Sequence, residues 1–153
     1  MELKRAIQII RRMRHDFGNH LQVISGFLEL GRYEDLREYL DYLVESLAAE
    51  RTVFDSPDEK TALFLYEQLL LAHDLGIILR YKEIKLKSVN VVELLQSNGE
   101  PHKTLASQAN RLRTLKADEP TVTLSLYETA EGIDLVFGCE EYFADNLVIS
   151  LKE

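Results

Sequence analysis

Apolar residues recur every three or four positions along the first third of the chain, which is the spacing of one face of an α-helix. His20 falls in the same register, so we expect it to face the interior of the fold. Gly31, a residue type that often ends helices, predicts a turn at Gly31–Tyr33. The apolar seam consists of Leu3, Ala6, Ile10, Met13, Phe17, Ile24 and Phe27, with Ile7, Leu21 and Leu28 along one flank.

A second amphipathic helix is expected directly after this turn. Its apolar face contains Leu36, Tyr39, Leu40, Leu43, Val44 and Leu47, and acids lie largely on the other face. A lone hairpin cannot bury two such broad apolar faces, whereas two copies can form an antiparallel four-helix bundle. The pattern therefore predicts a homodimer.

The periodicity breaks at Asp55–Glu59, where a Ser-Pro turn stands among acidic residues. We expect a helical hairpin domain over 1–54 and a small α/β domain over 58–153, which together give an α+β fold. In the second domain, the pattern predicts a helix over about 58–75 that ends at Gly76, and one or two helices between 91 and 115, broken at 98–101. The predicted strands cover 77–81, a hairpin of 121–127 with 133–137, and 147–151.

Composition excludes several classes of protein. The formal net charge of −8 argues against sequence-independent nucleic-acid binding. The single cysteine, Cys139, rules out an internal disulfide and suits a reducing compartment. The longest apolar run, over 62–72, is too short to cross a bilayer, and the charged N-terminus is unlike a signal peptide. We therefore expect a cytoplasmic protein with no membrane association.

The candidate chemistry lies on the face of the first helix opposite the seam. His15 points away from the seam there, with Asp16 beside it and Asn19 one turn later. An imidazole can act as a nucleophile toward an acyl phosphate when a neighbour orients its second nitrogen. Asp16 and His20, four residues apart, lack a third ligand, so no metal site is predicted. Cations gather around His15: Lys4, Arg5, Arg11, Arg12 and Arg14.

Residues Arg14–Leu21 resemble the phosphoacceptor box Arg-His-Asp-Phe-x-Asn-His/Lys-Leu of sensor-kinase families and of the sporulation initiation phosphotransferase B family. The match continues through Gln22–Tyr33. This resemblance implies that His15 is the phosphorylated residue and that Asp16 and Asn19 assist transfer or hydrolysis. It also implies the dimeric four-helix bundle and a partnership with response-regulator receiver domains.

The second domain stands where such kinases carry an ATP-binding domain. The helix 105–112 keeps Asn110 but has Ala109 where these families usually have an acid. After Phe137 the sequence reads Gly-Cys-Glu-Glu in place of Asn-x-Gly, and the fifteen residues after Gly138 are too few for a lid and a second phosphate loop. We expect a degenerate ATPase-like domain, no autokinase activity and no cofactor, with Mg²⁺ supplied by the receiver.

The resemblance implies a histidine phosphotransferase that moves a phosphoryl group between response-regulator aspartates through His15. Two alternatives stay open, a non-catalytic modulator that binds a response regulator or a kinase, and a receiver-directed phosphatase in which Asn19 positions water. The residues expected to contact the receiver are Arg11, Arg12, Arg14 and Gln22.

Overall fold

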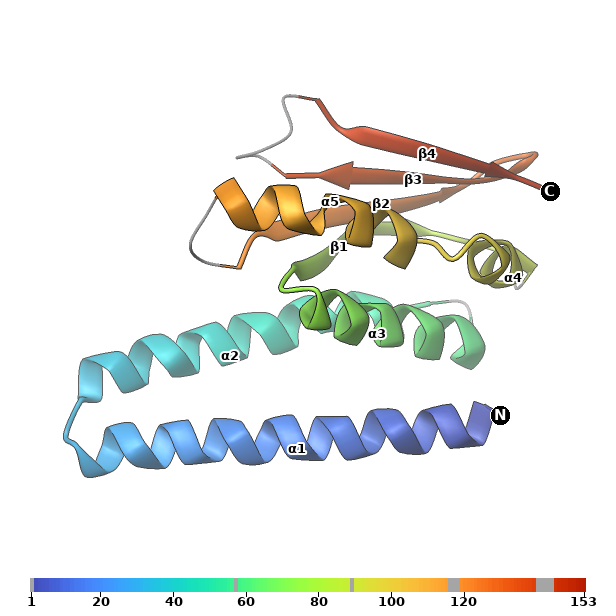
Figure 1. Cartoon of the computed structure of the whole chain (residues 1–153). Coiled ribbons are helices and arrows are strands. Elements are labelled where there is room, and N and C mark those ends of the chain that lie inside the picture. Colours follow the sequence, from blue (N-terminus) through green and yellow to red (C-terminus); the bar gives the residue numbers. More distant parts are fainter. Residues whose placement is uncertain (1, 57, 89, 116–118, 140–144) are drawn as a thin grey trace. The chain divides into compact units, whose positions relative to one another are not determined.

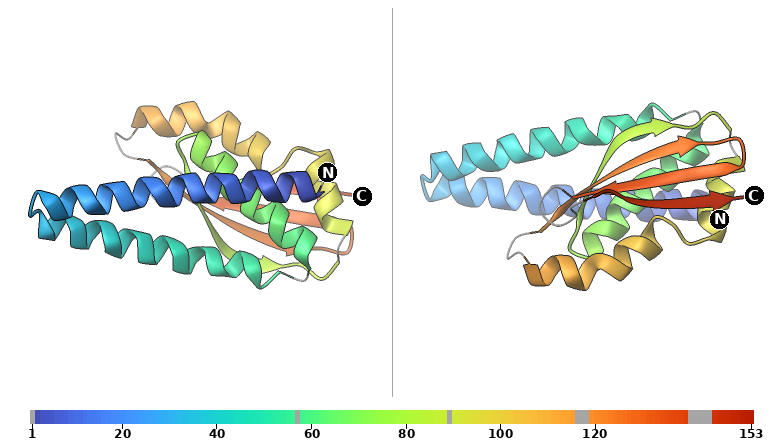
Figure 2. Two further views of the ribbon diagram at one scale, coloured as in Figure 1. Left: turned by 90° about the horizontal axis from the view of Figure 1, so that it is seen from below. Right: turned by 90° about the horizontal axis from the view of Figure 1, so that it is seen from above.

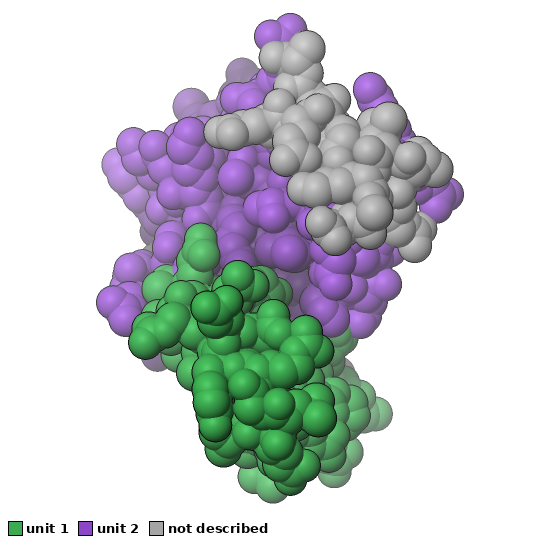
Figure 3. Space-filling view, turned by 90° about the vertical axis from the view of Figure 1, so that its left-hand side faces the viewer, with its two compact units in different colours: residues 1–48 green, residues 49–153 purple. Residues whose placement is uncertain are grey.

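The computed structural model describes residues 2–56, 58–88, 90–115, 119–139 and 145–153. It contains helices and a mixed sheet, so the predicted α+β fold class is confirmed (Figure 1). Two compact units are distinguished, Met1–Ala48 and Ala49–Glu153 (Figure 3). The elements are α1 (Glu2–Glu29), α2 (Tyr33–Phe54), α3 (Glu59–Asp74), β1 (Ile78–Lys85), α4 (Asn90–Ser97), α5 (His102–Leu115), β2 (Thr121–Glu128), β3 (Gly132–Gly138) and β4 (Leu147–Lys152).

The first unit contains α1 and most of α2, joined by the turn that the sequence predicted. Gly31 adopts a left-handed conformation with φ +68°. The Arg32 N–H donates to the Phe27 carbonyl at 2.9 Å and the Gly31 N–H donates to the Leu28 carbonyl at 3.2 Å. This pair of bonds is the Schellman motif, which satisfies carbonyls that the helix end leaves without partners. The motif ends α1 and reverses the chain into α2.

The second unit is a four-stranded sheet in the order β1-β2-β3-β4, with α3, α4 and α5 on one of its faces (Figure 2). Strand β1 is parallel to β2, and the other two pairs are antiparallel. The predicted helices and the hairpin of β2 and β3 are present. Strand β1 extends four residues beyond the predicted Tyr81, to Lys85, because backbone pairing with β2 continues past a register shift between Tyr81 and Glu83.

The core of this unit lies between the sheet and its helices. Leu124 of β2 pairs with Phe137 of β3, and both side chains are almost fully buried. Tyr81 reaches across from β1 and donates its hydroxyl to the Leu65 carbonyl of α3 at 2.8 Å. Burial raises the pKa of the Tyr81 phenol, so this hydroxyl stays neutral and donates. The unit therefore holds its helices on the sheet through its own apolar core.

The two breaks between helices also agree with the sequence pattern. Asp58 caps α3, and its carboxylate accepts from the backbone N–H of Thr61 at 2.9 Å. Gly99 has φ +68° after α4, and the Glu100 carboxylate accepts from the Thr104 N–H at 2.9 Å at the start of α5. Both carboxylates accept hydrogen bonds at helix N-termini, where the backbone N–H groups otherwise lack partners.

Candidate functional site

His15 lies midway along α1 with its side chain 75% exposed. Its Nδ1 has two neighbours on the same helix. The Asp16 Oδ1 is 3.6 Å from this nitrogen, and the Asn19 Nδ2 is 3.5 Å from it. The structure thus brings the three candidate catalytic residues together at one ring nitrogen and leaves the imidazole accessible.

The two neighbours of Nδ1 require different states of the ring. The Asn19 amide donates to Nδ1 only when that nitrogen carries a lone pair and Nε2 carries the proton. The Asp16 carboxylate accepts from Nδ1 only when the proton is there. The Asn19 separation is at the outer limit of hydrogen bonding, whereas the Asp16 separation is longer than a hydrogen bond and acts through the charge of the carboxylate. Since a nucleophilic Nε2 needs a lone pair, the contact with Asp16 favours the reactive tautomer.

Asp16 has a further neighbour on its other oxygen. The Arg12 Nε is 3.9 Å from Asp16 Oδ2, one turn earlier on α1. The side chains of Arg12 and Asp16 are 28% and 40% exposed, so both are partly covered. Arg12 was predicted only as a receiver contact, although its i, i+4 spacing from Asp16 is a signal for this pair.

The remaining residues predicted to contact the receiver are exposed positions of α1. Arg11 and Gln22 lie one turn before and two turns after His15, on the same side of the helix by its 3.6-residue period. Arg14 is exposed about a quarter of a turn around from His15. These side chains line the surface around His15.

His20 lies in the interior of the hairpin, as its seam position predicted. Its Nδ1 is 2.5 Å from the Tyr39 hydroxyl of α2, and the two ring centroids are 5.8 Å apart. Partial burial, and then the nearby Tyr42, raise the pKa of Tyr39, so the phenol remains protonated near neutral pH. Tyr39 was not predicted as the partner of His20.

Large apolar side chains remain exposed on the hairpin. On α1, Phe17 is 63% exposed, and on α2, Leu47 is 71% exposed. By helical spacing, the exposed stripe of α1 is on the side of the helix away from His15. The stripes comprise Leu3, Ile7, Ile10, Met13, Phe17, Leu21 and Leu28 of α1, and Tyr33, Leu40, Val44 and Leu47 of α2.

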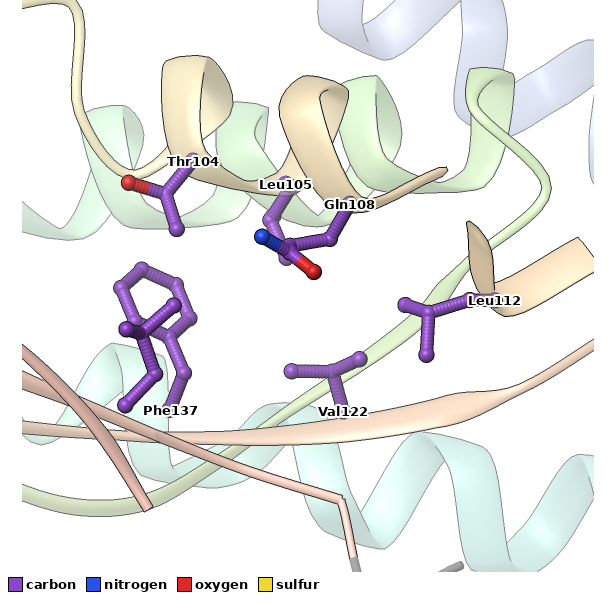
Figure 4. A pocket seen from close by; sticks show the side chains of 7 residues that line it. Thr104, Leu105, Gln108, Leu112, Val122 and Phe137 are labelled. Carbon is purple, nitrogen blue, oxygen red and sulfur yellow. The ribbon is translucent and has the colours of Figure 1, made fainter. Parts of the chain in front are cut away.

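In the second unit, the space between α5 and the sheet is filled by side chains. A cavity of about 10 Å³ remains there, which is room for one water at most (Figure 4). The side chains of Leu112 and Phe137 close it and are almost fully buried. Asn110 is an exposed position of α5.

Gly138 ends β3, in the part of the chain that we compared with a phosphate-binding turn. A Cβ at this position would meet the Thr123 Oγ1 at 2.7 Å, so any larger residue would require the Thr123 side chain to shift. Glu140 and Glu141 of the same comparison lie outside the described residues.

The described residues are 2–56, 58–88, 90–115, 119–139 and 145–153. Among those residues, no three His, Cys, Asp or Glu side chains are grouped so that they could hold a metal ion. Within the same residues, no helix combines the length and apolar character needed to span a membrane.

The site is therefore an exposed histidine on the first helix of an antiparallel hairpin, with a carboxylate and an amide at one ring nitrogen. Residues 1–55 match a family model described as the alpha-helical domain of SpoOB-type sensor kinases. The match covers α1 and α2 and confirms the predicted resemblance for this part of the chain, which is thus similar to a domain of phosphorelay and sensor-kinase proteins. A search of curated proteins finds no match to the chain.

Proposed function

We propose that this protein is a histidine phosphotransferase of a phosphorelay. His15 accepts a phosphoryl group from the aspartyl phosphate of one response-regulator receiver and passes it to the aspartate of another. The observation that carries this proposal is the exposed imidazole with the Asp16 carboxylate near Nδ1, an arrangement that favours a proton on Nδ1 and a reactive lone pair on Nε2. The similarity of residues 1–55 to a SpoOB-type domain supports it.

In the first half of the transfer, the Nε2 lone pair of His15 attacks the phosphorus of the aspartyl phosphate. The Nε2–P bond forms, the P–O bond to the aspartate breaks, and the departing carboxylate keeps the electron pair. The ring retains its Nδ1 proton and becomes positively charged beside the Asp16 carboxylate. In the second half, a carboxylate oxygen of the other receiver attacks phosphorus, and the Nε2–P electron pair returns to the ring.

The chain provides position and charge for these steps. A helix holds the imidazole at a fixed place, so the reacting atoms need little further ordering. Arg11, Arg14 and Gln22 lie on the surface around His15 and suit the acidic pocket of a receiver domain. The Mg²⁺ of the reaction belongs to the receiver in this proposal.

The exposed apolar stripes support a homodimer. Phe17 and Leu47 project from the two helices of one hairpin, and a second copy would cover both in a four-helix bundle. Since His15 is on the side of α1 away from its stripe, it would face outward from that bundle.

The second unit is, in this proposal, a degenerate ATPase-like scaffold. The closure of the space beneath α5 by Leu112 and Phe137 supports this view. Calorimetric titration with ATP and Mg²⁺ is expected to show no saturable binding, and incubation with ATP should leave the protein unphosphorylated. Saturable ATP binding that Asn110→Ala removes would instead support a kinase.

The decisive experiment follows labelled phosphate from a phosphorylated receiver. The wild-type protein should acquire an acid-labile, base-stable label and transfer it to a second receiver, and His15→Ala should acquire none. His20→Gln is the matched histidine control and should still be labelled at His15. Release of free phosphate without transfer would identify a phosphatase, and receiver binding without labelling would identify a non-catalytic modulator.

A further inference from the structure

Arg12 differs from the other cations near His15. Its side chain is only 28% exposed, whereas Arg11 and Arg14 are exposed positions of α1. Its Nε lies 3.9 Å from Asp16 Oδ2. The guanidinium is thus placed beside the acid of the site.

The Asp16 carboxylate joins two residues through its two oxygens. Oδ2 faces the Arg12 Nε, and Oδ1 faces the His15 Nδ1 at 3.6 Å. An aspartate on a helix surface can adopt several rotamers, and few of them would place an oxygen beside the preceding residue's ring. Attraction between Arg12 and Oδ2 favours the rotamer that keeps Oδ1 at His15.

We propose that Arg12 is a positioning residue that acts on His15 through Asp16, an inference that rests on the proposed phosphotransfer. Arg12 holds the carboxylate so that Oδ1 stays beside Nδ1, where its negative charge favours a proton on that nitrogen. The proton then stays at Nδ1 and the lone pair stays at Nε2, where the phosphorus is attacked. Without Arg12, the Asp16 carboxylate leaves His15 more often, and the Asn19 amide stabilises the opposite tautomer by donating to Nδ1.

The first test needs no receiver. Nitrogen-15 NMR of the histidine-labelled full-length protein distinguishes Nδ1–H from Nε2–H, and comparison with His15→Gln assigns the His15 signals. Arg12→Gln should shift His15 toward the Nε2–H tautomer, and Asp16→Asn should shift it further. Arg12→Gln should add nothing once Asp16→Asn is present. Arg11→Gln, the same change on the neighbouring residue, should leave the tautomer unchanged.

The second test measures transfer kinetics. Arg12→Gln should lower kcat by about two- to fivefold, the effect expected of an exposed ion pair, and leave KM for the receiver nearly unchanged. Arg11→Gln should raise KM and leave kcat nearly unchanged. Arg12→Lys keeps the charge and should restore part of kcat.

The outcomes separate this inference from the function on which it rests. If Arg12→Gln leaves the His15 tautomer unchanged, or raises KM as Arg11→Gln does, Arg12 is a docking residue and the inference is wrong. If no receiver transfers phosphate to the wild-type protein, the proposed function fails, while the NMR comparison still decides whether Arg12 acts through Asp16.

Discussion

His20 Nδ1 and the Tyr39 hydroxyl are 2.5 Å apart, so a polar contact joins α1 to α2 inside the hairpin. Tyr39 also meets Phe27 edge to face, with ring centroids 6.2 Å apart. His15, five residues before His20, has an exposed ring with an acid and an amide beside it. The same residue type therefore has two environments on one helix, and only that of His15 suits contact with a partner.

Tyr39→Phe is expected to weaken the hairpin and leave phosphotransfer largely intact. The substitution keeps the ring contacts but removes the hydroxyl from His20, which should lower the free energy of unfolding by about 0.5–1.5 kcal/mol. Urea unfolding followed by circular dichroism measures this change. Tyr42→Phe is the matched control, because the described contact of Tyr42 with Tyr39 is between rings. Equal effects of the two variants would show that the His20 contact contributes nothing.

Phe17→Glu is expected to convert the proposed dimer into monomers. Phe17 is 63% exposed, and a carboxylate at this position would be buried without a partner when a second copy packs on the stripe. Sedimentation velocity or light scattering gives the mass of each variant. Gln22→Glu introduces the same charge on the His15 side of the helix and should remain dimeric. A wild-type protein that is monomeric at all concentrations would contradict the bundle.

Gly31→Ala is expected to destabilise the hairpin by about 1 kcal/mol, because a Cβ disfavours the left-handed backbone conformation at φ +68°. Gly26→Ala is the opposite case. An added Cβ there meets nothing within 4 Å, and alanine should raise helix stability by about 0.5–1 kcal/mol. Thermal unfolding should show a lower melting temperature for Gly31→Ala and a higher one for Gly26→Ala. A lower melting temperature for Gly26→Ala would mean that another chain approaches that position.

The cap of α3 predicts a pH dependence of stability. The hydrogen bond from the Thr61 N–H lowers the pKa of the Asp58 carboxyl below its ordinary value. A carboxyl with a lowered folded-state pKa stabilises the protein fully above its unfolded pKa, about 4, and loses this contribution as pH falls through the folded value. Asp58→Asn keeps a capping side chain that does not titrate.

The difference in melting temperature between wild type and Asp58→Asn should therefore be constant near neutral pH and shrink below about pH 4. A difference that does not vary with pH would show that the charge of Asp58 has no part in the cap. Thr61→Ala is not a clean control, since the Thr61 side chain also bonds to Asp58.

The sequence predicted the elements well where periodicity and helix-ending residues agree. Gly31 ended α1 as expected, and the seam placed His20 in the interior. The extension of β1 to Lys85 was missed because backbone pairing with β2 requires no apolar alternation. Tyr39 as the partner of His20 could not be found from one helix alone, since the contact depends on the register between two helices.

The sequence identified which residues form the candidate site, but it did not predict which of their side-chain atoms lie next to each other. His15, Asp16 and Asn19 share a helix, so their proximity follows from spacing. Which oxygen of Asp16 faces which neighbour depends on rotamers, which the sequence does not specify. Arg12 was consequently grouped with Arg11 as a receiver contact.

The last prediction concerns how a receiver docks. His15 lies midway along α1, so a receiver has to approach the side of the hairpin, with contacts one turn either side of the histidine. Arg11→Glu places a like charge opposite the acidic pocket of a receiver. Association should slow by about two- to tenfold at low salt and become less salt-dependent, with little change in the rate of transfer once the complex has formed. Stopped-flow association at several ionic strengths measures both effects.

Lys82→Glu is the matched control, because it makes the same charge reversal at an exposed position of β1 in the second unit. Side-on docking at His15 predicts that this change leaves association nearly unaffected apart from the small effect of net charge. Asn19→Ala should keep the association rate of the wild type and alter transfer or phosphate loss, since Asn19 contacts the reacting ring. If Lys82→Glu slows association and Arg11→Glu does not, the receiver docks on the second unit, and His15 has to be reached from there.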